Sequence, residues 1–142
     1  MNTPAERNTV HIEESGHGPF GQFVSIGQHI LGADEPGPMG GENTGPDPFE
    51  LVMAGLGACT AMTVRMYANR KTWPLEEVRV AVNHVRATGK DGEKPHAFER
   101  LVTLQGPLDD TQRERLIAIA DRCPVHRLLE AGAEIVTRAV PA

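Results

Sequence analysis

One apolar stretch near the middle of the chain restricts its fold more than any other feature. Residues 51–64, LVMAGLGACTAMTV, contain no charged side chain, and their apolar positions extend beyond one helical face. Before this stretch come Asp47, Pro48 and Glu50, which match an N-cap acceptor, a proline at the first helical position and a carboxylate at N3. The sequence therefore predicts a capped helix that other parts of the protein enclose on most sides.

Two properties of this predicted helix narrow its setting. The apolar stretch covers about 14 residues, which is too short to cross a lipid bilayer, so we interpret it as a buried core helix. Gly55 and Gly57 each weaken a helix by roughly 1 kcal/mol relative to alanine. Glycines at these positions therefore indicate close backbone contact with another element.

The remaining sequence predicts strands and short helices in separate blocks. Three short strands before the helix form an antiparallel meander, and a loop rich in glycine and proline follows them at residues 34–46. After the helix we expect a hairpin of two strands, two short helices and a closing strand. Their predicted ranges are 78–88, 98–106, 108–123, 123–132 and 134–140. This order of elements predicts an α+β fold.

Composition and charge exclude several classes of protein. The chain has 142 residues, and we expect a single domain over 1–142 with a flexible start at 1–8. The net charge is −5 and no run of lysine and arginine occurs, so nothing indicates binding to nucleic acid or to an anionic membrane. The N-terminus lacks the basic and apolar regions of a secretory signal, so we expect a cytoplasmic protein.

The chain has two cysteines, and the second lies at a predicted helix start. Cys123 directly precedes Pro124, which favours the first helical position and makes Cys123 the N-cap. There the thiol faces unpaired backbone N–H groups and the positive end of the helix dipole, with His126 at N3 and Arg127 one turn on. These features lower the pKa of a thiol. The alternative is that Cys123 only caps and packs, while Arg127 is a solvated surface charge.

The first cysteine, Cys59, lies in the middle of the predicted long helix among Gly, Ala, Leu and Met. Such surroundings raise the pKa of a thiol unless a charge approaches, so core packing is favoured for Cys59 taken alone. Zinc binding by Cys59, Cys123 and His126 is a third interpretation, but structural zinc sites usually have two local ligand pairs and only one occurs here. No nucleotide-binding motif occurs, and we expect neither a cofactor nor a metal.

Two segments together resemble a known family. GPDPFELVMAGLGACTAMTV at 45–64, followed by CPVHR at 123–127, is similar to the OsmC/Ohr superfamily of thiol-dependent peroxide reductases, and most to its OsmC-like branch. The likeness extends over about residues 20–140. For the fold, the resemblance implies antiparallel β-sheets around a long buried cysteine-bearing helix, in an intertwined α+β homodimer with that helix at the subunit interface.

The resemblance also implies roles for the two thiols. The cysteine matching Cys59 attacks the peroxide and becomes a sulfenic acid, and the one matching Cys123 condenses with it to a disulfide that an external dithiol reduces. The local features rank the two thiols in the opposite order. The two views are compatible, because a resolving cysteine with a low pKa is a good leaving group. His126, Arg127 and Glu50 are the residues nearby in sequence that could support the pair.

The sequence departs from the family at the group that holds the attacking thiolate. In the family's peroxidases a loop arginine holds the thiolate and is oriented by a glutamate two residues before the motif leucine. The matching position here is Phe49, and the capping pattern accounts for Glu50. No arginine or lysine lies between Arg7 and Arg65, so the loop supplies no cation, and Arg7, Arg65 and Arg127 are the substitutes that we considered. A missing cation often costs about 3 kcal/mol in rate.

We therefore expect a cytoplasmic homodimer that reduces organic hydroperoxides in oxidative or osmotic stress defence, with Cys59 peroxidatic and Cys123 resolving. Its partners would be a small-molecule hydroperoxide and an external dithiol, with neither nucleic acid nor a membrane. The alternative is a non-catalytic OsmC-like protein that binds a small apolar molecule or a thiol, its cysteines serving as packing residues. Phe49 and the missing loop arginine favour this alternative.

Overall fold

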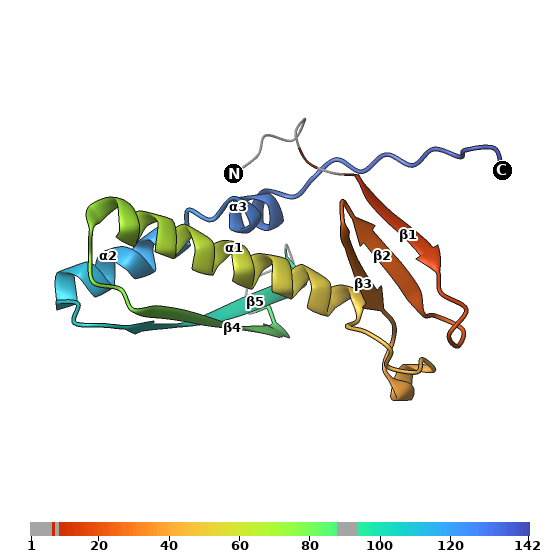
Figure 1. Ribbon diagram of the computed structural model, residues 1–142, viewed down its shortest axis with the longest axis horizontal. Coiled ribbons are helices and arrows are strands. Elements are labelled where there is room, and N and C mark those ends of the chain that lie inside the picture. Colours follow the sequence, from red (N-terminus) through yellow and green to blue (C-terminus); the bar gives the residue numbers. More distant parts are fainter. Residues whose placement is uncertain (1–6, 8, 88–93) are drawn as a thin grey trace. The chain divides into compact units, whose positions relative to one another are not determined.

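The computed structural model of the protein describes residue 7, residues 9–87 and residues 94–142. In this part of the chain, a meander of strands precedes a long helix, and a hairpin and two short helices follow it (Figure 1). The α+β class predicted from the sequence is confirmed. The chain divides into two compact units, Met1–Val52 and Met53–Ala142. The single domain expected over 1–142 stays a prediction, and the flexible start expected at 1–8 lies almost entirely outside the described residues.

The first unit is built on an antiparallel meander. The strands β1 (Val10–Glu14), β2 (Gln22–Ile26) and β3 (His29–Ala33) pair in chain order, as the sequence predicts. The predicted loop follows β3 and contains one short 3-10 helix, η2 (Gly37–Met39). The meander therefore ends in a loop of defined shape, which leads into the long helix.

The buried carboxylate of Asp34 fixes the shape of this loop. It accepts hydrogen bonds from the backbone N–H groups of Glu35, Glu42 and Thr44, and from the hydroxyl of Thr44 at 2.7 Å. The hydrogen bonds from Thr44 are the main reason that the pKa of Asp34 is lowered. An ionised side chain thus ties both ends of the loop together.

The long helix α1 (Pro48–Lys71) begins as the sequence predicts. The Asp47 carboxylate accepts from the Glu50 N–H at 2.8 Å, and the Glu50 carboxylate accepts from the Asp47 N–H at 2.9 Å, which is a reciprocal capping box. With 24 residues, α1 is by length and composition able to cross a membrane, so the sequence argument that it is too short is wrong. Core helices of soluble proteins meet the same criterion.

The second unit packs α1 against a hairpin. The strands β4 (Glu77–Arg86) and β5 (His96–Gln105) are antiparallel, and most of the predicted connection between them, 88–93, lies outside the described residues. A Cβ at Gly57 would lie 3.2 Å from a methyl carbon of Val82, so the close contact predicted for this glycine is confirmed. At Gly55 a Cβ would meet no described atom within 4 Å.

Two short helices follow the hairpin. Helix α2 (Asp110–Ala120) is capped by Asp109 through a second capping box. Helix α3 (Pro124–Ala131) begins directly after Cys123, its N-cap, and ends at Gly132, which has a φ of 82°. The sequence predicts both helices and both ends of α3. The turn between α2 and α3 carries Cys123 and therefore positions the second thiol.

The closing strand predicted at 134–140 is wrong. No strand is formed after α3, and the side chains of Ile135, Val136 and Val140 are 63–87% exposed. A strand exists only where its backbone bonds to a neighbouring strand. No described strand of this chain pairs with the segment. Its apolar residues alternate as they do in a strand, but this local pattern does not show whether a neighbouring strand is present to pair with it.

A continuous core joins α1, α2 and the hairpin. Its buried members are Val64, Ala68, Leu75, Leu108, Leu116 and Ala120, with Tyr67, Trp73, Val78 and Leu104 packed around them. Leu116 has no exposed surface and is among the largest of the fully buried side chains. The position of α2, and with it the turn that carries Cys123, therefore depends on this residue.

We expect Leu116→Ala to lower the free energy of unfolding by about 3 kcal/mol, because it removes buried contacts and leaves a cavity. Urea denaturation followed by circular dichroism measures this loss. Ile117→Ala is the matched control: Ile117 is the next residue of α2 and is 46% exposed, so its loss should stay below about 1 kcal/mol. Equal losses for the two variants would contradict this assignment of the core.

Candidate active site

The fold brings the two cysteines together. Cys59, from the middle of α1, and Cys123, from the start of α3, lie in one cluster of buried residues with Leu56. Val82, Phe98 and Val125 pack around this cluster. Both thiols are free, and the exposed fraction is 6% for Cys59 and zero for Cys123. Two thiols from distant parts of the sequence thus share one buried apolar cluster.

Hydrogen-bond donors surround the sulfur of Cys123. As the N-cap of α3, it accepts from the backbone N–H of His126 at 3.5 Å. Burial, the largest single effect, raises the pKa of Cys123, but hydrogen bonds from Cys59, His126, Thr60 and Val125 together outweigh it and leave the pKa lowered. The lowered pKa expected from the position of Cys123 at a helix start agrees with this result.

The environment of Cys59 acts in the opposite direction. Burial is the main reason that the pKa of Cys59 is raised, and the hydrogen bond and the charge of Cys123 raise it further. The backbone N–H of Val125 and the hydroxyl of Thr63 act weakly in the other direction. In the reduced pair the negative charge is therefore stabilised on Cys123, while Cys59 keeps its proton and donates it toward Cys123.

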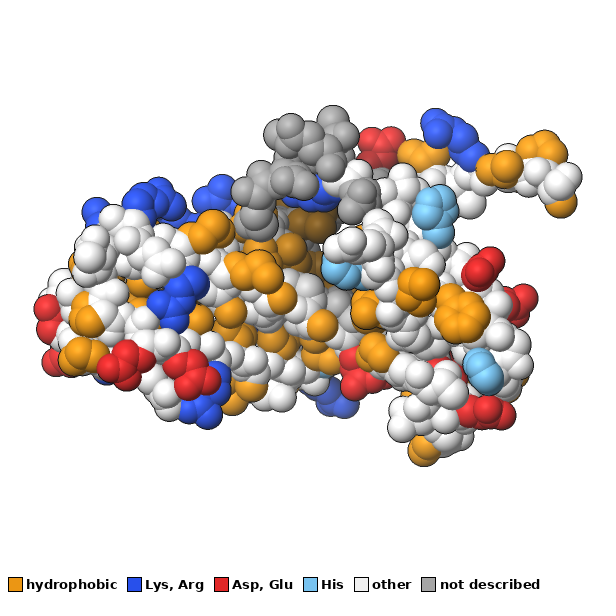
Figure 2. Space-filling model, in the orientation of Figure 1, with side chains coloured by type: hydrophobic (Ala, Val, Ile, Leu, Met, Phe, Trp, Pro, Cys, Tyr) orange, Lys and Arg blue, Asp and Glu red, His pale blue; other side chains and the backbone are white. Residues whose placement is uncertain are grey.

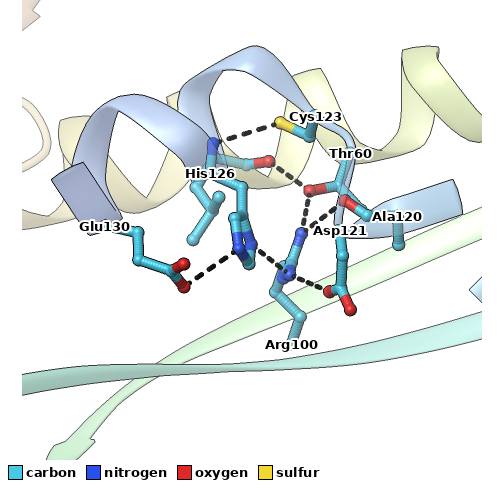
Figure 3. A network of polar contacts seen from close by, with 8 residues as sticks. Thr60, Arg100, Ala120, Asp121, Cys123, His126 and Glu130 are labelled. Atoms are coloured by element: carbon cyan, nitrogen blue, oxygen red, sulfur yellow. Dashed lines mark hydrogen bonds and ion pairs between the residues drawn. The ribbon is translucent and has the colours of Figure 1, made fainter. Parts of the chain in front are cut away.

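The partly buried guanidinium of Arg100 lies among Thr60, Asp121 and His126, next to the turn that carries Cys123 (Figure 3). Arg100 lies on β5 opposite Val82, and only 13% of its side chain is exposed. One of its terminal nitrogens donates to the Thr60 hydroxyl at 3.0 Å and to the Ala120 carbonyl at 2.9 Å. The other donates to the Asp121 carboxylate at 2.9 Å and approaches a ring nitrogen of His126 at 2.6 Å.

His126 is held from two sides. Its Nδ1 accepts from Arg100 at 2.6 Å, and its Nε2 lies 3.2 Å from the carboxylate of Glu130, one turn further along α3. Only a neutral imidazole with its proton on Nε2 fits both contacts, because Nδ1 must accept. The sequence placed His126 beside Cys123 correctly. Its backbone N–H reaches the sulfur, whereas its ring faces Arg100.

The structure does not bring together Cys59, Cys123 and His126 as metal ligands. Both ring nitrogens of His126 are already engaged, by Arg100 and by Glu130. Within the described ranges, no group of three His, Cys, Asp or Glu side chains could hold a metal ion. The zinc interpretation therefore has no support in the geometry of this cluster.

The other cations proposed from the sequence lie elsewhere. The Arg127 side chain is exposed, and it is not among the main groups that set the pKa of Cys123. Arg65 donates to the backbone carbonyls of Leu75 and Glu76 and so ties α1 to the segment before β4. Arg7 is exposed. Glu50 has the capping role described above.

Sequence reasoning missed Arg100 and Thr60, although a signal for each was present. Along β5 the partly buried side chains alternate, and Arg100 occupies an inward position between Phe98 and Val102. A charged residue at an inward position of a strand needs a buried partner. Thr60 lies four residues after Leu56 and four before Val64, on the buried face of α1. A polar side chain on that face indicates a functional or structural hydrogen bond.

Comparison with known proteins settles the family. The family model described as OsmC-like protein matches residues 41–138, which include both cysteines and Arg100. The chain belongs to the OsmC-like protein family. This family lies within the resemblance stated from the sequence. A comparison with curated proteins finds no match.

Three solved structures illustrate the likeness. An OsmC-like protein from Mycoplasma pneumoniae has 18% identity and a TM-score of 0.69, with 88% of each chain covered. The organic hydroperoxide resistance protein OsmC from Legionella pneumophila has 22% identity and a TM-score of 0.63, with 89% of this chain and 91% of that chain covered. The organic hydroperoxide resistance protein OhrB of Bacillus subtilis has 17% identity and a TM-score of 0.54, with 84% and 88% covered. At these identities the likeness establishes the fold.

We expect Cys123 to ionise at lower pH than Cys59. The thiolate absorbance at 240 nm, followed during a pH titration, measures each thiol separately in the Cys59→Ser and Cys123→Ser variants. The Cys59→Ser variant, which keeps Cys123, should titrate at a lower pH than the Cys123→Ser variant, which keeps Cys59. The reverse order would contradict the charge distribution described for this site.

Proposed function

We propose that this OsmC-like protein is a cytoplasmic, thiol-dependent reductase of organic hydroperoxides, in which Cys59 is peroxidatic and Cys123 resolving. The observation that carries the proposal is the shared cluster: two free thiols lie together among buried residues, with opposite shifts of their pKa values. A pair that only packed would not need hydrogen-bond donors aimed at one of its sulfurs. The apolar side chains of Leu56, Val82 and Phe98 that pack around the thiols suit an organic peroxide.

The first step uses Cys123 as a base. The thiolate of Cys123 takes the proton of the Cys59 thiol, and the resulting Cys59 thiolate attacks the terminal oxygen of the hydroperoxide. The O–O bond breaks, and the departing alkoxide takes the proton back from Cys123 and leaves as an alcohol. Cys59 is now a sulfenic acid and Cys123 again a thiolate. Thr63 assists, because its buried hydroxyl makes no other hydrogen bond in the described structure and acts on Cys59, to whose thiolate it can donate.

The second step closes the disulfide. The Cys123 thiolate attacks the sulfenic sulfur of Cys59, the S–O bond breaks, and hydroxide leaves as water after taking a proton. An external dithiol then reduces the disulfide and is itself oxidised to a disulfide. The pair returns to its starting state with one peroxide reduced and one dithiol oxidised.

We expect one equivalent of cumene hydroperoxide to convert the protein to a form with an intramolecular Cys59–Cys123 disulfide. Mass spectrometry of unreduced peptides identifies this bond. Cys59→Ser should leave Cys123 unmodified, and Cys123→Ser should accumulate a sulfenic acid on Cys59 that dimedone traps. Two free thiols after treatment of the wild-type protein would instead favour the alternative, a non-catalytic protein that binds small molecules or thiols.

We also propose that the protein is a homodimer whose interface includes α1. In the single chain, Met62 and Met66 are 59% and 44% exposed although they lie on the most apolar helix, and Gly55 on the same helix has open space beside it. Hydrophobic side chains lie exposed over the region of α1 in Figure 2. A second copy of the chain would cover this face, and the glycine would permit close approach of its backbone. This arrangement covers α1 without a membrane.

We expect Met62→Glu to convert the homodimer to a monomer, because it places a charge in the proposed interface. Analytical ultracentrifugation measures the mass, which should fall to that of one chain. Met39→Glu is the matched control: Met39 is an equally exposed methionine in η2, outside α1, and this substitution should leave the mass unchanged. A wild-type protein that sediments as a single chain would refute the dimer.

A further inference from the structure

We propose that Arg100 is the positioning residue of the cysteine pair: it fixes the Thr60 hydroxyl and the turn before α3, so that Cys123 leaves as a thiolate when a dithiol reduces the Cys59–Cys123 disulfide. The inference rests on the redox function proposed above. A residue of β5 thus takes over the support of the thiolate, since the loop before α1 has no arginine or lysine.

Arg100 joins three helices to the hairpin at the point where the sulfurs meet. Its hydrogen bonds reach Thr60 on α1, Ala120 and Asp121 at the end of α2, and the ring of His126 on α3. The turn that carries Cys123 is therefore held on both of its sides by one guanidinium. Because no bond from Arg100 to either sulfur is formed in the described structure, it acts through other groups.

Thr60 transmits the effect to the sulfur. Its oxygen accepts from Arg100 at 3.0 Å, and its single hydrogen points to the Leu56 carbonyl at 2.7 Å, from which it turns to Cys123 when that sulfur carries a negative charge. Thr60 is also among the groups whose hydrogen bonds lower the pKa of Cys123. A hydroxyl that accepts from a cation becomes a stronger donor, so Arg100 strengthens the bond that Thr60 offers to a thiolate.

The positive charge of Arg100 is only partly neutralised by its neighbours. Asp121 is its one carboxylate partner in the described structure, and 71% of the Asp121 side chain is exposed, so water screens that charge. His126 meets Arg100 through a neutral ring nitrogen, and Glu130 lies on the far side of that ring. Arg100 is not itself among the main groups that set the pKa of Cys123, so this partly buried cation acts on the thiolate through Thr60 and the turn before α3.

This arrangement selects the sulfur that the reductant attacks. A thiolate of the dithiol attacks the sulfur of Cys59, the disulfide bond breaks, and Cys123 departs with the electron pair as a thiolate. The second thiol of the reductant then attacks the mixed disulfide, releases Cys59, which takes a proton, and leaves as an oxidised dithiol. Of the two cysteines, only Cys59 has any exposed surface, so a reductant can reach its sulfur more easily.

Two measurements test the role of Arg100. In a Cys59→Ser background, Arg100→Gln should lower the fraction of Cys123 thiolate, read at 240 nm, about tenfold at a fixed pH below the pKa, because the neutral amide no longer supports the anion. In the chain with both cysteines, the disulfide formed with diamide should be reduced by dithiothreitol several-fold more slowly in Arg100→Gln than in the wild type.

A matched control separates this effect from a loss of structure. Arg113 is another partly buried arginine. It donates at 2.7 Å to the backbone carbonyls of Leu104 and Gly106, and neither bond involves a residue that contacts the cysteines. Arg113→Gln should leave the thiolate fraction and the reduction rate unchanged. A folded Arg100→Gln variant that also leaves both unchanged would overturn the proposal.

A second pair of variants decides the question if Arg100→Gln does not fold. Thr60→Val keeps the shape of the side chain but removes the hydroxyl, and it should reduce the Cys123 thiolate fraction in the same direction. Thr63→Val removes the neighbouring hydroxyl, which acts on Cys59, and should leave Cys123 unaffected. Equal effects of the two threonine variants on Cys123 would overturn the proposal.

These outcomes are independent of the peroxide chemistry. Diamide forms the disulfide without a peroxide, so a protein that ignores hydroperoxides can still confirm the role of Arg100. Conversely, a protein that forms the disulfide with cumene hydroperoxide can fail the Arg100 test.

In a third readout, the monothiol 2-mercaptoethanol should leave its mixed disulfide on Cys59 in the wild type. An adduct found on Cys123 would overturn the assignment of Cys123 as the leaving group.

Discussion

The close packing of α1 on the β4–β5 hairpin determines the rest of the site. At Gly57 the helix backbone approaches Val82 so nearly that a side chain would press against it. Cys59 and Thr60 follow within one turn, and Arg100 lies directly across the sheet from Val82. One contact between a glycine and a valine therefore brings a thiol, a hydroxyl and a guanidinium into the same small volume. The helix pays about 1 kcal/mol for this glycine.

The site holds two thiols in unequal surroundings. Both are buried, which alone would raise both pKa values, but only at Cys123 do the hydrogen-bond donors outweigh the effect of burial. The pair therefore behaves as one acid–base unit, in which Cys123 carries the negative charge and Cys59 carries the proton. Such a unit accounts for how Cys59, in apolar surroundings, could react without a loop arginine: its base is the second thiol.

Much of the fold follows from local sequence signals. The capping box at Asp47 and Glu50, the alternation along β4 and Pro124 after Cys123 each specify an element within a few residues. The closing strand failed because strand formation needs a partner that local sequence does not contain. The pairing of Cys59 with Cys123 came from the family resemblance, since no local spacing connects them.

Arg100 shows why the site itself was harder to predict. Its role depends on which side of β5 faces the helices and on where the end of α2 falls, and both are tertiary facts. The alternation of β5 does place Arg100 inward, so a search for charged residues at inward positions would have found it. Two of the candidates chosen instead, Arg65 and Arg127, were near the cysteines in sequence, but Arg65 binds backbone carbonyls before β4 and Arg127 is exposed.

The N-cap position of Cys123 couples oxidation to the stability of α3. A thiolate is a strong acceptor for the first N–H groups of that helix, whereas a sulfur in a disulfide is a poor one. Forming the disulfide therefore weakens the cap, and every interaction that favours the thiolate raises the reduction potential of the pair. The helix start thus acts as a thermodynamic bias toward the dithiol state, and α3 should fray at its first turn whenever the protein is oxidised.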